Sequence, residues 1–449
     1  MFSICKPGFK QKKCKAMNPF LDDERVKELL AEVERLNLKG KHYSDIIDEQ
    51  GCQYVDLVQQ GGGVLGIALV GYTHILEEAG IRFLSLAGTS AGAINTMMIA
   101  GLGEIGKPVS TQILDILCNV NLFDFADGNP RLKSLIQRII DEKPFKLNLF
   151  FNSLLIWRTL KKELGLNPGM YFEKWVDENL RLAGIGNLGD LQKHRQKLPK
   201  LIDRVTGDPI ERQADLKIIA SDITSKSKIT FPEMAELYWD NPTLISPACF
   251  VRASMSIPFF FQPYRVFNIP NAGTVENPNL PKGQTKWIRH VGYRGPIPKE
   301  VSFVDGGMLS NFPIDAFHLT NGVPKKPTFG ARLSTWRSSC SKTDTLGAMC
   351  GAMVSTMRQL HDYDFLLKHE DYKNLICSID ADEKLDENGN LMFNWLDFNM
   401  PKEKQIALFI LGAEKALEFL SSFNWGYYKG VRAVLQSVKP KTIQTKNYE

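Results

Sequence analysis

Apolar and polar positions alternate most clearly between residues 53 and 101. Two short apolar runs, Tyr54–Val58 and Phe83–Ala87, have the length and composition of buried strands. The segments 66–79 and 93–100 are longer, mainly apolar and close to glycine at their ends, which predicts a helix after each strand. The order strand, helix, strand, helix indicates a βαβα unit and therefore an α/β protein with a parallel sheet.

Helical spacing of apolar positions predicts several more helices. Residues 18–37 place acidic side chains before an amphipathic run, as a helix N-terminus does. The segment 105–200 is expected to be mostly helical, and the segments 341–371 and 402–422 largely so. Residues 266–298 are rich in Pro, Gly and Asn and predict a surface loop. The remaining expected elements are a buried helix within 244–258 and strands at Leu216–Ala220, from Thr230 onward and at Val301–Val304.

The composition fits a soluble globular protein. Of the 449 residues, 43% are apolar and 23% are charged, and no run of 18 apolar residues predicts a transmembrane helix. The first 16 residues contain five lysines but no apolar segment follows, so we expect no Sec signal peptide. These lysines are interpreted as a solvated tail rather than as a weak anchor to anionic lipid.

Charge and cysteine usage exclude several classes of function. The net charge of +5 is modest and diffuse, which does not indicate nucleic-acid binding. The eight cysteines are scattered without a Cys-x-x-Cys pair, so we expect reduced thiols, no metal site and no cofactor.

The pentapeptide Gly88-Thr89-Ser90-Ala91-Gly92 is the first candidate for chemistry. A predicted strand precedes it, a predicted helix follows it, and small residues flank the serine, as a nucleophile elbow requires. Ser90 would then stand at a helix N-terminus, where free N–H groups stabilise a developing oxyanion. An ordinary strand-to-helix turn that happens to contain serine is the alternative.

The glycines Gly61, Gly62 and Gly63 follow the first predicted strand. Because neighbouring parallel strands end at the same edge of a sheet, this loop should lie beside Ser90 and supply backbone N–H groups to an oxyanion. A flexible turn is the simpler alternative. Together with Gly66 the loop also fits the dinucleotide pattern G-x-G-x-x-G, but Ala87-Gly88-Thr89-Ser90 occupies the place of the acidic residue that nucleotide binding requires.

Asp305 follows the apolar strand Val301–Val304 and precedes Gly306 and Gly307. Taken alone, an aspartate before two glycines is more often a turn residue than a catalytic group. Together with an elbow and a glycine-rich loop, it becomes the candidate partner of Ser90.

These three motifs, in this order and spacing, resemble those of the patatin-like phospholipases. The resemblance covers roughly residues 51–320. Two further segments fit it: Arg252–Pro258 resembles the stretch ahead of the aspartate motif, and Ser221–Thr224 resembles the usual polar strand end. One position departs from the pattern, since Leu65 stands where the family commonly has Arg or Lys. The loss of that charge is expected to lower the rate or to alter headgroup preference.

The resemblance implies a three-layer α/β/α fold with a mainly parallel sheet, and a Ser–Asp dyad without histidine. Ser90 would be the nucleophile and Asp305 the general base, with Gly61, Gly62, Gly63 and Ala91 as the oxyanion site and Gly66, Gly88, Gly92, Gly306 and Gly307 as supporting glycines. The expected activity is hydrolysis of acyl esters of phospholipids or lysophospholipids at a membrane surface. An unknown protein activator is left open, as is peripheral membrane association of an otherwise cytoplasmic protein.

Three parts of the chain are expected: a basic tail and helix at 1–50, a catalytic domain at 51–330 and a mainly helical extension at 331–449 packed on the core. Residues 145–160 are expected to form either a lid or a fixed cap helix.

Three alternatives to this function stay open. An acyltransferase would use the same acyl-enzyme with an alcohol in place of water, and Leu65 alone favours a weakly active lipid-binding homologue. A three-residue site would add His318 or His361 after Asp305, but neither histidine lies in a recognisable loop after a strand.

Two apolar groups could either pack in the core or contact lipid. Met349, Met353 and Met357 recur every four residues, which favours core packing over a lipid-facing stripe. Phe259-Phe260-Phe261 is expected either in the core or as a wall of the acyl-chain site.

Overall fold

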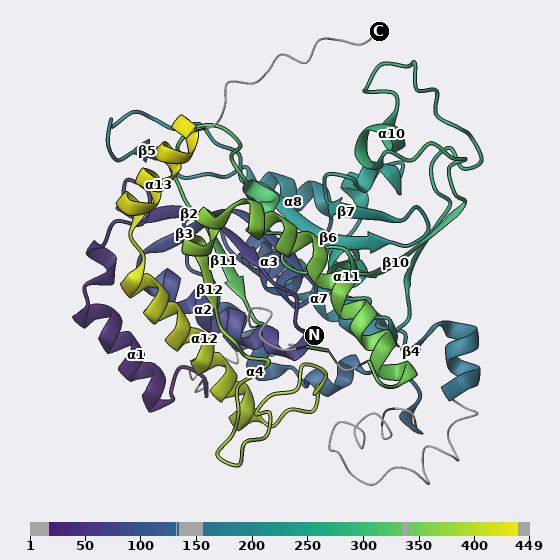
Figure 1. Cartoon of the computed structure of the whole chain (residues 1–449), viewed down its shortest axis with the longest axis horizontal. Helices are drawn as coiled ribbons and strands as arrows, with labels where there is room; N and C mark the ends of the chain where they lie inside the picture. Colours follow the sequence, from purple (N-terminus) through teal and green to yellow (C-terminus); the bar gives the residue numbers. More distant parts are fainter. Residues whose placement is uncertain (1–17, 132, 134–155, 335–339, 342, 439–449) are drawn as a thin grey trace, which may run out of the picture.

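The computed structural model describes residues 18–131, 133, 156–334, 340–341 and 343–438 (Figure 1). Within them, a ten-stranded sheet forms the centre of the molecule, with the main strand order β12-β11-β2-β3-β6-β10-β9. The strands from β12 to β6 are parallel, whereas β10 is antiparallel to both β6 and β9. The strands in this order are β12 (Ile376–Ser378), β11 (Thr328–Arg332), β2 (Gln53–Gln59), β3 (Ile81–Thr89), β6 (Leu216–Asp222), β10 (Glu300–Asp305) and β9 (Tyr264–Phe267).

Shorter strands extend the margins of this sheet. An antiparallel strand, β7 (Ser227–Phe231), returns along β6, and β1 (Ile46–Asp48) joins β2 to β5 (Leu201–Asp203). A separate parallel pair consists of β4 (Gly165–Asn167) and β8 (Phe259–Phe261).

Helices cover both faces of the sheet. Figure 1 shows α11 crossing in front of the strands and α3 behind them. The helix α3 packs against β2, β3 and β6, while α11 packs against the turns that follow β10. The helices are α1 (Glu24–Arg35), α2 (Ile67–Glu78), α3 (Ala91–Leu102), α4 (Ser110–Asn119), α7 (Met170–Leu182), α8 (Leu188–Arg195), α9 (Ala248–Ser254), α10 (Lys286–Val291), α11 (Leu346–Lys368), α12 (Lys402–Ser422) and α13 (Trp425–Val438).

The α/β fold with a largely parallel central sheet, expected from the sequence, is confirmed. The predicted βαβα unit appears as β2, α2, β3 and α3, and the predicted strand before Asp305 appears as β10. In the described residues, no helix combines the length and the apolar character that crossing a membrane requires. Most of the expected lid or cap at 145–160, and the lysine-rich tail, lie outside the described residues.

Two expectations about local structure were wrong. The supposed loop 266–298 contains α10, which the Trp287 side chain anchors in the core at 3% exposure. The segment after residue 331, expected to be mainly helical, contains α11, α12 and α13 and also the short strand β12, which joins the central sheet beside β11. The methionines predicted to pack in the core are instead 43%, 58% and 46% exposed at positions 349, 353 and 357.

The triple phenylalanine is divided between surface and core. Phe259 is 69% exposed, whereas Phe260 and Phe261 are buried. Phe260 stacks on Phe398, with ring centroids 5.0 Å apart, so only the last two rings contribute to the interior.

The extension is joined to the glycine-loop side of the fold by close packing of α12 on α2. The two helices approach at Gly71 and Gly412. A Cβ on Gly71 would collide with the carbonyl oxygen of Phe409, and a Cβ on Gly412 would collide with that of Ala68. Because both obstacles are backbone atoms, neither can move aside without separating the helices.

We therefore predict that Gly412→Ala destabilises the protein, although alanine is intrinsically the better helix former. Overpacking of this kind costs about 1–3 kcal/mol in the free energy of unfolding, to be measured by urea denaturation. Gly430→Ala is the matched control in α13, since a Cβ there meets nothing within 4 Å. Equal stability of the two variants would show that α12 does not pack closely on α2.

Candidate active site

Ser90 lies in a sharp turn between β3 and α3. Its backbone has φ 53° and ψ −120°, a conformation that is strained for a residue with a side chain. The turn closes tightly, because a Cβ on Gly92 would collide with the carbonyl oxygen of Gln59 on the neighbouring strand. Ser90 is the N-terminal boundary residue of α3, so its hydroxyl stands beside the first N–H groups of that helix. The predicted elbow geometry is thus present.

Strand register brings Asp305 to the same level as Ser90. Thr89 at the end of β3 is opposite Ile219 of β6, and Asp305 at the end of β10 is opposite Ala220, while β7 pairs with the other side of β6 at both positions. The C-terminal ends of β3 and β10 thus meet along one side of β6, where the Ser90 Oγ donates a hydrogen bond of 2.6 Å to Asp305 Oδ2. The predicted pair is therefore in direct contact, although β3 and β10 do not pair with each other.

The Asp305 carboxylate is buried, with 5% of the residue exposed. Its Oδ1 accepts a hydrogen bond of 2.7 Å from the N–H of Gly307, and its own N–H donates to the carbonyl oxygen of Ser256. Burial raises the pKa of Asp305 above that of an ordinary aspartate, because the charged form loses water. The positive charge of Arg358 and the hydrogen bonds from Ser90 and Gly307 act in the opposite direction.

A second serine holds the strained turn in place. The backbone N–H of Ser90 donates to the Oγ of Ser254 at 2.8 Å, and that Oγ donates to the carbonyl oxygen of Ile219 at 2.5 Å. Ser254 ends α9, which packs against β6 and β10, so this bond ties the turn to the strand along which β3 and β10 meet. Met255 follows, and its sulfur lies 3.3 Å from the Ser90 Oγ.

The glycine loop stands beside Ser90, as predicted. A Cβ on Gly61 would lie 2.9 Å from the Cβ of Ser90, so only glycine fits there. However, the N–H of Gly61 donates to the carbonyl oxygen of Asn311 at 3.0 Å. That N–H is therefore already engaged, which leaves the N–H groups of Gly62, Gly63 and Ala91 as the candidate oxyanion donors.

Residues far along the chain fix the rest of the loop. The N–H of Val64 donates to the carbonyl oxygen of Trp395. Gly63, at φ 57°, packs so closely on the same carbonyl group that an added Cβ would collide with it. The segment after β12 thus covers the glycine loop and sets its conformation.

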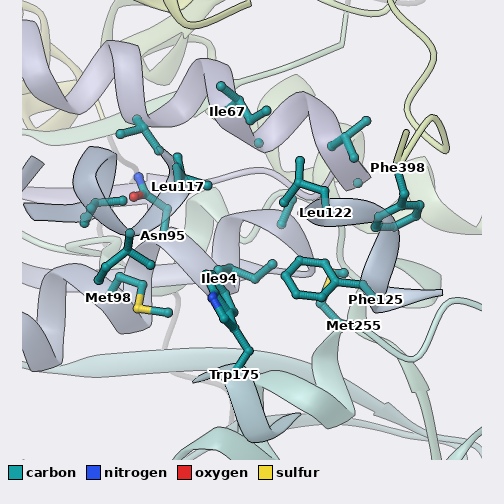
Figure 2. A pocket seen from close by; sticks show the side chains of 17 residues that line it. Ile67, Ile94, Asn95, Met98, Leu117, Leu122, Phe125, Trp175, Met255 and Phe398 are labelled. Carbon is teal, nitrogen blue, oxygen red and sulfur yellow. The ribbon is translucent and has the colours of Figure 1, made fainter. Parts of the chain in front are cut away.

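An apolar cavity opens from this loop. Figure 2 shows side chains from several elements converging on it, among them Ile67, Leu122 and Trp175. It is bounded near the candidate dyad by Gly63, Ala91 and Met255, and farther along α3 by Met98, while Leu117 and Phe398 also line it. A space lined in this way suits a hydrocarbon chain and repels charged groups.

The histidines considered for a three-residue site are engaged elsewhere. His318 bonds to the hydroxyl of Tyr372 at 2.9 Å and packs against Phe365. His361 lies close to Lys228 and Asp315. The polar partner of the Ser90 hydroxyl is Asp305. Among the described residues, no group of His, Cys, Asp and Glu side chains could hold a metal ion.

Several site residues were not predicted from the sequence. Arg252–Pro258 was noted only as a resembling segment, whereas its Ser254 and Met255 contact Ser90 directly. Arg358, Trp395 and Phe398 carried no sequence signal, because they reach the site through tertiary packing. Asn311 could have been suspected, since it lies six residues after Asp305.

Comparison with known proteins defines the class. A family model described as "Patatin-like phospholipase" matches residues 57–318, which is more than half of the chain. The chain therefore belongs to the patatin-like phospholipase family, and at the level of that family it is a lipid acyl hydrolase.

Individual relatives are more distant. The chain is 30% identical over 376 residues to the uncharacterized protein YqhO of Bacillus subtilis strain 168. This similarity extends over 83% of this chain and the whole of YqhO. Among solved structures, it is similar to VipD from Legionella pneumophila with 15% identity and a TM-score of 0.38, over 85% of this chain and 70% of that one.

We predict that Ser254→Ala lowers kcat by roughly ten- to a hundredfold. The buried N–H of Ser90 would lose its acceptor, and a small displacement of a reacting atom is costly at this scale. Ser302→Ala, a half-buried position of β10, the strand on which α9 packs, is the control and should retain the wild-type kcat. Steady-state hydrolysis of a soluble ester measures both, and a wild-type kcat in Ser254→Ala would contradict a supporting role for this serine.

Proposed function

We propose that the protein hydrolyses fatty acyl esters of phospholipids or lysophospholipids, with Ser90 as nucleophile and Asp305 as general base. The observation that carries this proposal is the 2.6 Å hydrogen bond between their side chains, beside an apolar cavity that Ala91 and Met255 line. Membership of the patatin-like phospholipase family supports a lipid ester as the substrate.

The reaction would proceed in two steps. In the first, Asp305 takes the proton of the Ser90 hydroxyl while the Oγ attacks the ester carbonyl. The N–H groups of Gly62, Gly63 and Ala91 stabilise the resulting oxyanion, and the alcohol leaves with the proton that Asp305 returns. In the second, water attacks the acyl-enzyme while Asp305 accepts its proton, and Asp305 then returns that proton to the Ser90 Oγ as the fatty acid departs.

The surroundings of Asp305 suit this exchange of protons. An ordinary aspartate, with a pKa near 3.9, is a weak base. Burial of the Asp305 carboxylate raises its pKa and therefore makes it a better acceptor for the Ser90 proton. The neighbouring hydrogen bonds and the charge of Arg358 limit this rise, so that the ionised form needed for the first step stays accessible.

The cavity supports a long acyl chain as the group transferred. It lies next to Ala91 at the start of α3 and reaches Met98, two turns farther along the same helix. Eight residues of helix span about 12 Å, which matches an extended chain of roughly ten carbon atoms.

The exposed methionines of α11 support access from a membrane surface. Met353 and Met357 stand on the helix that carries Arg358, and Leu360 extends the same apolar side at 65% exposure. Flexible apolar side chains of this kind adapt to an irregular surface such as lipid.

We expect Ser90→Ala and Asp305→Asn each to reduce release of fatty acid from phospholipid vesicles by at least 10²–10⁴-fold, because each removes one half of the proton exchange. His318→Ala is the informative control, since His318 follows Asp305 in the chain but bonds to Tyr372. It should retain activity. If Asp305→Asn remains active while His318→Ala is inactive, the two-residue mechanism is wrong.

A second prediction concerns chain length. Met98→Trp should fill the far end of the cavity, so that hydrolysis of long-chain esters falls about tenfold or more while a four-carbon ester is turned over at the wild-type rate. The short ester reports whether the variant is folded. Met170→Trp, at a residue that is 72% exposed, is the control and should leave both rates unchanged. Equal loss on short and long esters would exclude this cavity as the acyl site.

A further inference from the structure

Arg358 projects from the middle of α11 toward the candidate active site. Its Nη2 donates a hydrogen bond of 3.2 Å to the Oδ1 of Asn311, and its guanidinium lies over the Trp395 ring, 5.7 Å from the ring centroid. The side chain is half-buried, and within the described residues it forms no ion pair. Among these residues, no carboxylate in direct contact neutralises its positive charge.

Asn311 connects this charge to the glycine loop. A guanidinium can only donate hydrogen bonds, so the atom facing Arg358 must be the amide oxygen of Asn311. The amide nitrogen is then directed to the carbonyl oxygen of Gly61, at 3.2 Å, while the backbone carbonyl of Asn311 accepts the N–H of Gly61. Asn311 thus binds Gly61 through both its backbone carbonyl and its side-chain amide. Arg358 sets the orientation of that amide.

The same amide oxygen lies beside the Asp305 carboxylate. A Cβ on Gly307 would be 2.6 Å from Asn311 Oδ1 and 2.7 Å from Asp305 Oδ1, so the two oxygens are near neighbours. Both hydrogen-bond donors to Asp305, the Ser90 hydroxyl and the Gly307 N–H, are uncharged. Of the charged groups, it is Arg358 that acts on the buried carboxylate, and it lowers the pKa that burial raises.

We propose that Arg358 is a positioning residue for the reaction, which orients Asn311 against the glycine loop and keeps the buried Asp305 in its ionised form. This inference rests on the function proposed above. It assigns a role to a residue outside the segment that the family model matches.

Other charged side chains on the elements packed around Asp305 have their own partners. They are Arg252 on α9, Asp222 on β6, and His361 and Asp362 on α11. Arg252 donates to Ser256 and to two backbone carbonyl groups, and Asp222 accepts from Ser225 and Tyr238. Asp362 accepts from Ser310 and from the backbone of Phe312, and His361 lies beside it. Because these side chains are paired with other groups, Arg358 is the charged residue that stabilises the ionised form of Asp305.

The test compares wild type, Arg358→Gln and Arg358→Lys on p-nitrophenyl butyrate, an uncharged ester, with kcat/KM measured as a function of pH. The base must be ionised, so kcat/KM falls as pH drops through the pKa of Asp305. Loss of the cation raises that pKa, and the acidic limb of Arg358→Gln should move to higher pH by roughly one unit. Arg358→Lys keeps the positive charge but loses the planar arrangement of guanidinium donors that orients Asn311. The acidic limb of its pH profile should therefore stay in place while kcat falls.

Lys368→Gln, at the exposed end of α11, is the control and should leave both the limb and kcat unchanged. Melting temperatures of all variants, together with the activity of Arg358→Lys, show whether the substituted proteins are folded. A merely structural role for Arg358 would lower kcat without moving the limb.

Two results would overturn the inference while leaving the proposed function intact. One is an unshifted acidic limb in Arg358→Gln. The other is a wild-type profile on p-nitrophenyl butyrate with a raised KM only on phosphatidylcholine vesicles, which would assign Arg358 to the phosphate of the headgroup instead. In contrast, full activity of Ser90→Ala would reject the proposed function itself.

Discussion

The site depends on one buried carboxylate that has no ion-pair partner in direct contact within the part of the chain that the structure describes. Removing the Asp305 carboxylate from water is costly, and the fold compensates with two short hydrogen bonds, from the Ser90 hydroxyl and the Gly307 N–H. The same burial gives the carboxylate a higher affinity for a proton. Much of the local architecture follows from this, since the glycines around it leave no side chain between the carboxylate, the serine and the loop.

The sheet explains how two residues 215 positions apart come to share a proton. On one side of β6, the parallel strand β3 ends opposite Ile219 and the antiparallel strand β10 ends opposite Ala220, so their C-terminal ends meet. If β10 ran parallel to β6 along this side, its first residue and not Asp305 would lie next to the end of β3. The antiparallel direction of β10 is thus a requirement of the site. It also explains why α9, which packs on both β6 and β10, supplies the serine that supports the turn.

Local signals were sufficient to predict the βαβα unit, the elbow and the aspartate motif, because each depends on backbone conformations that few residue types allow. The strands β11 and β12 escaped prediction, since Thr328–Arg332 contains glycine and alanine and Ile376–Ser378 is only three residues long. Trp395 was equally invisible, because a carbonyl oxygen that accepts a hydrogen bond leaves no trace in residue type. Phe398 reaches the cavity only through tertiary packing. The methionines of α11 were assigned to the core from periodicity alone, but a regular apolar stripe does not reveal whether another element covers it.

Leu65 shows how far a motif can be trusted on its own. From the sequence, a leucine in the glycine loop suggested a site that lacks a cation and is therefore weaker. The structure buries Leu65 at 3% exposure and brings a guanidinium to the neighbouring Asn311 from α11. A carboxylate responds to the positive potential at its position and not to the segment that supplies it. The charge expected within the loop can therefore come from a helix outside the matched segment, and such a replacement is found only by asking which side chains surround the carboxylate in space.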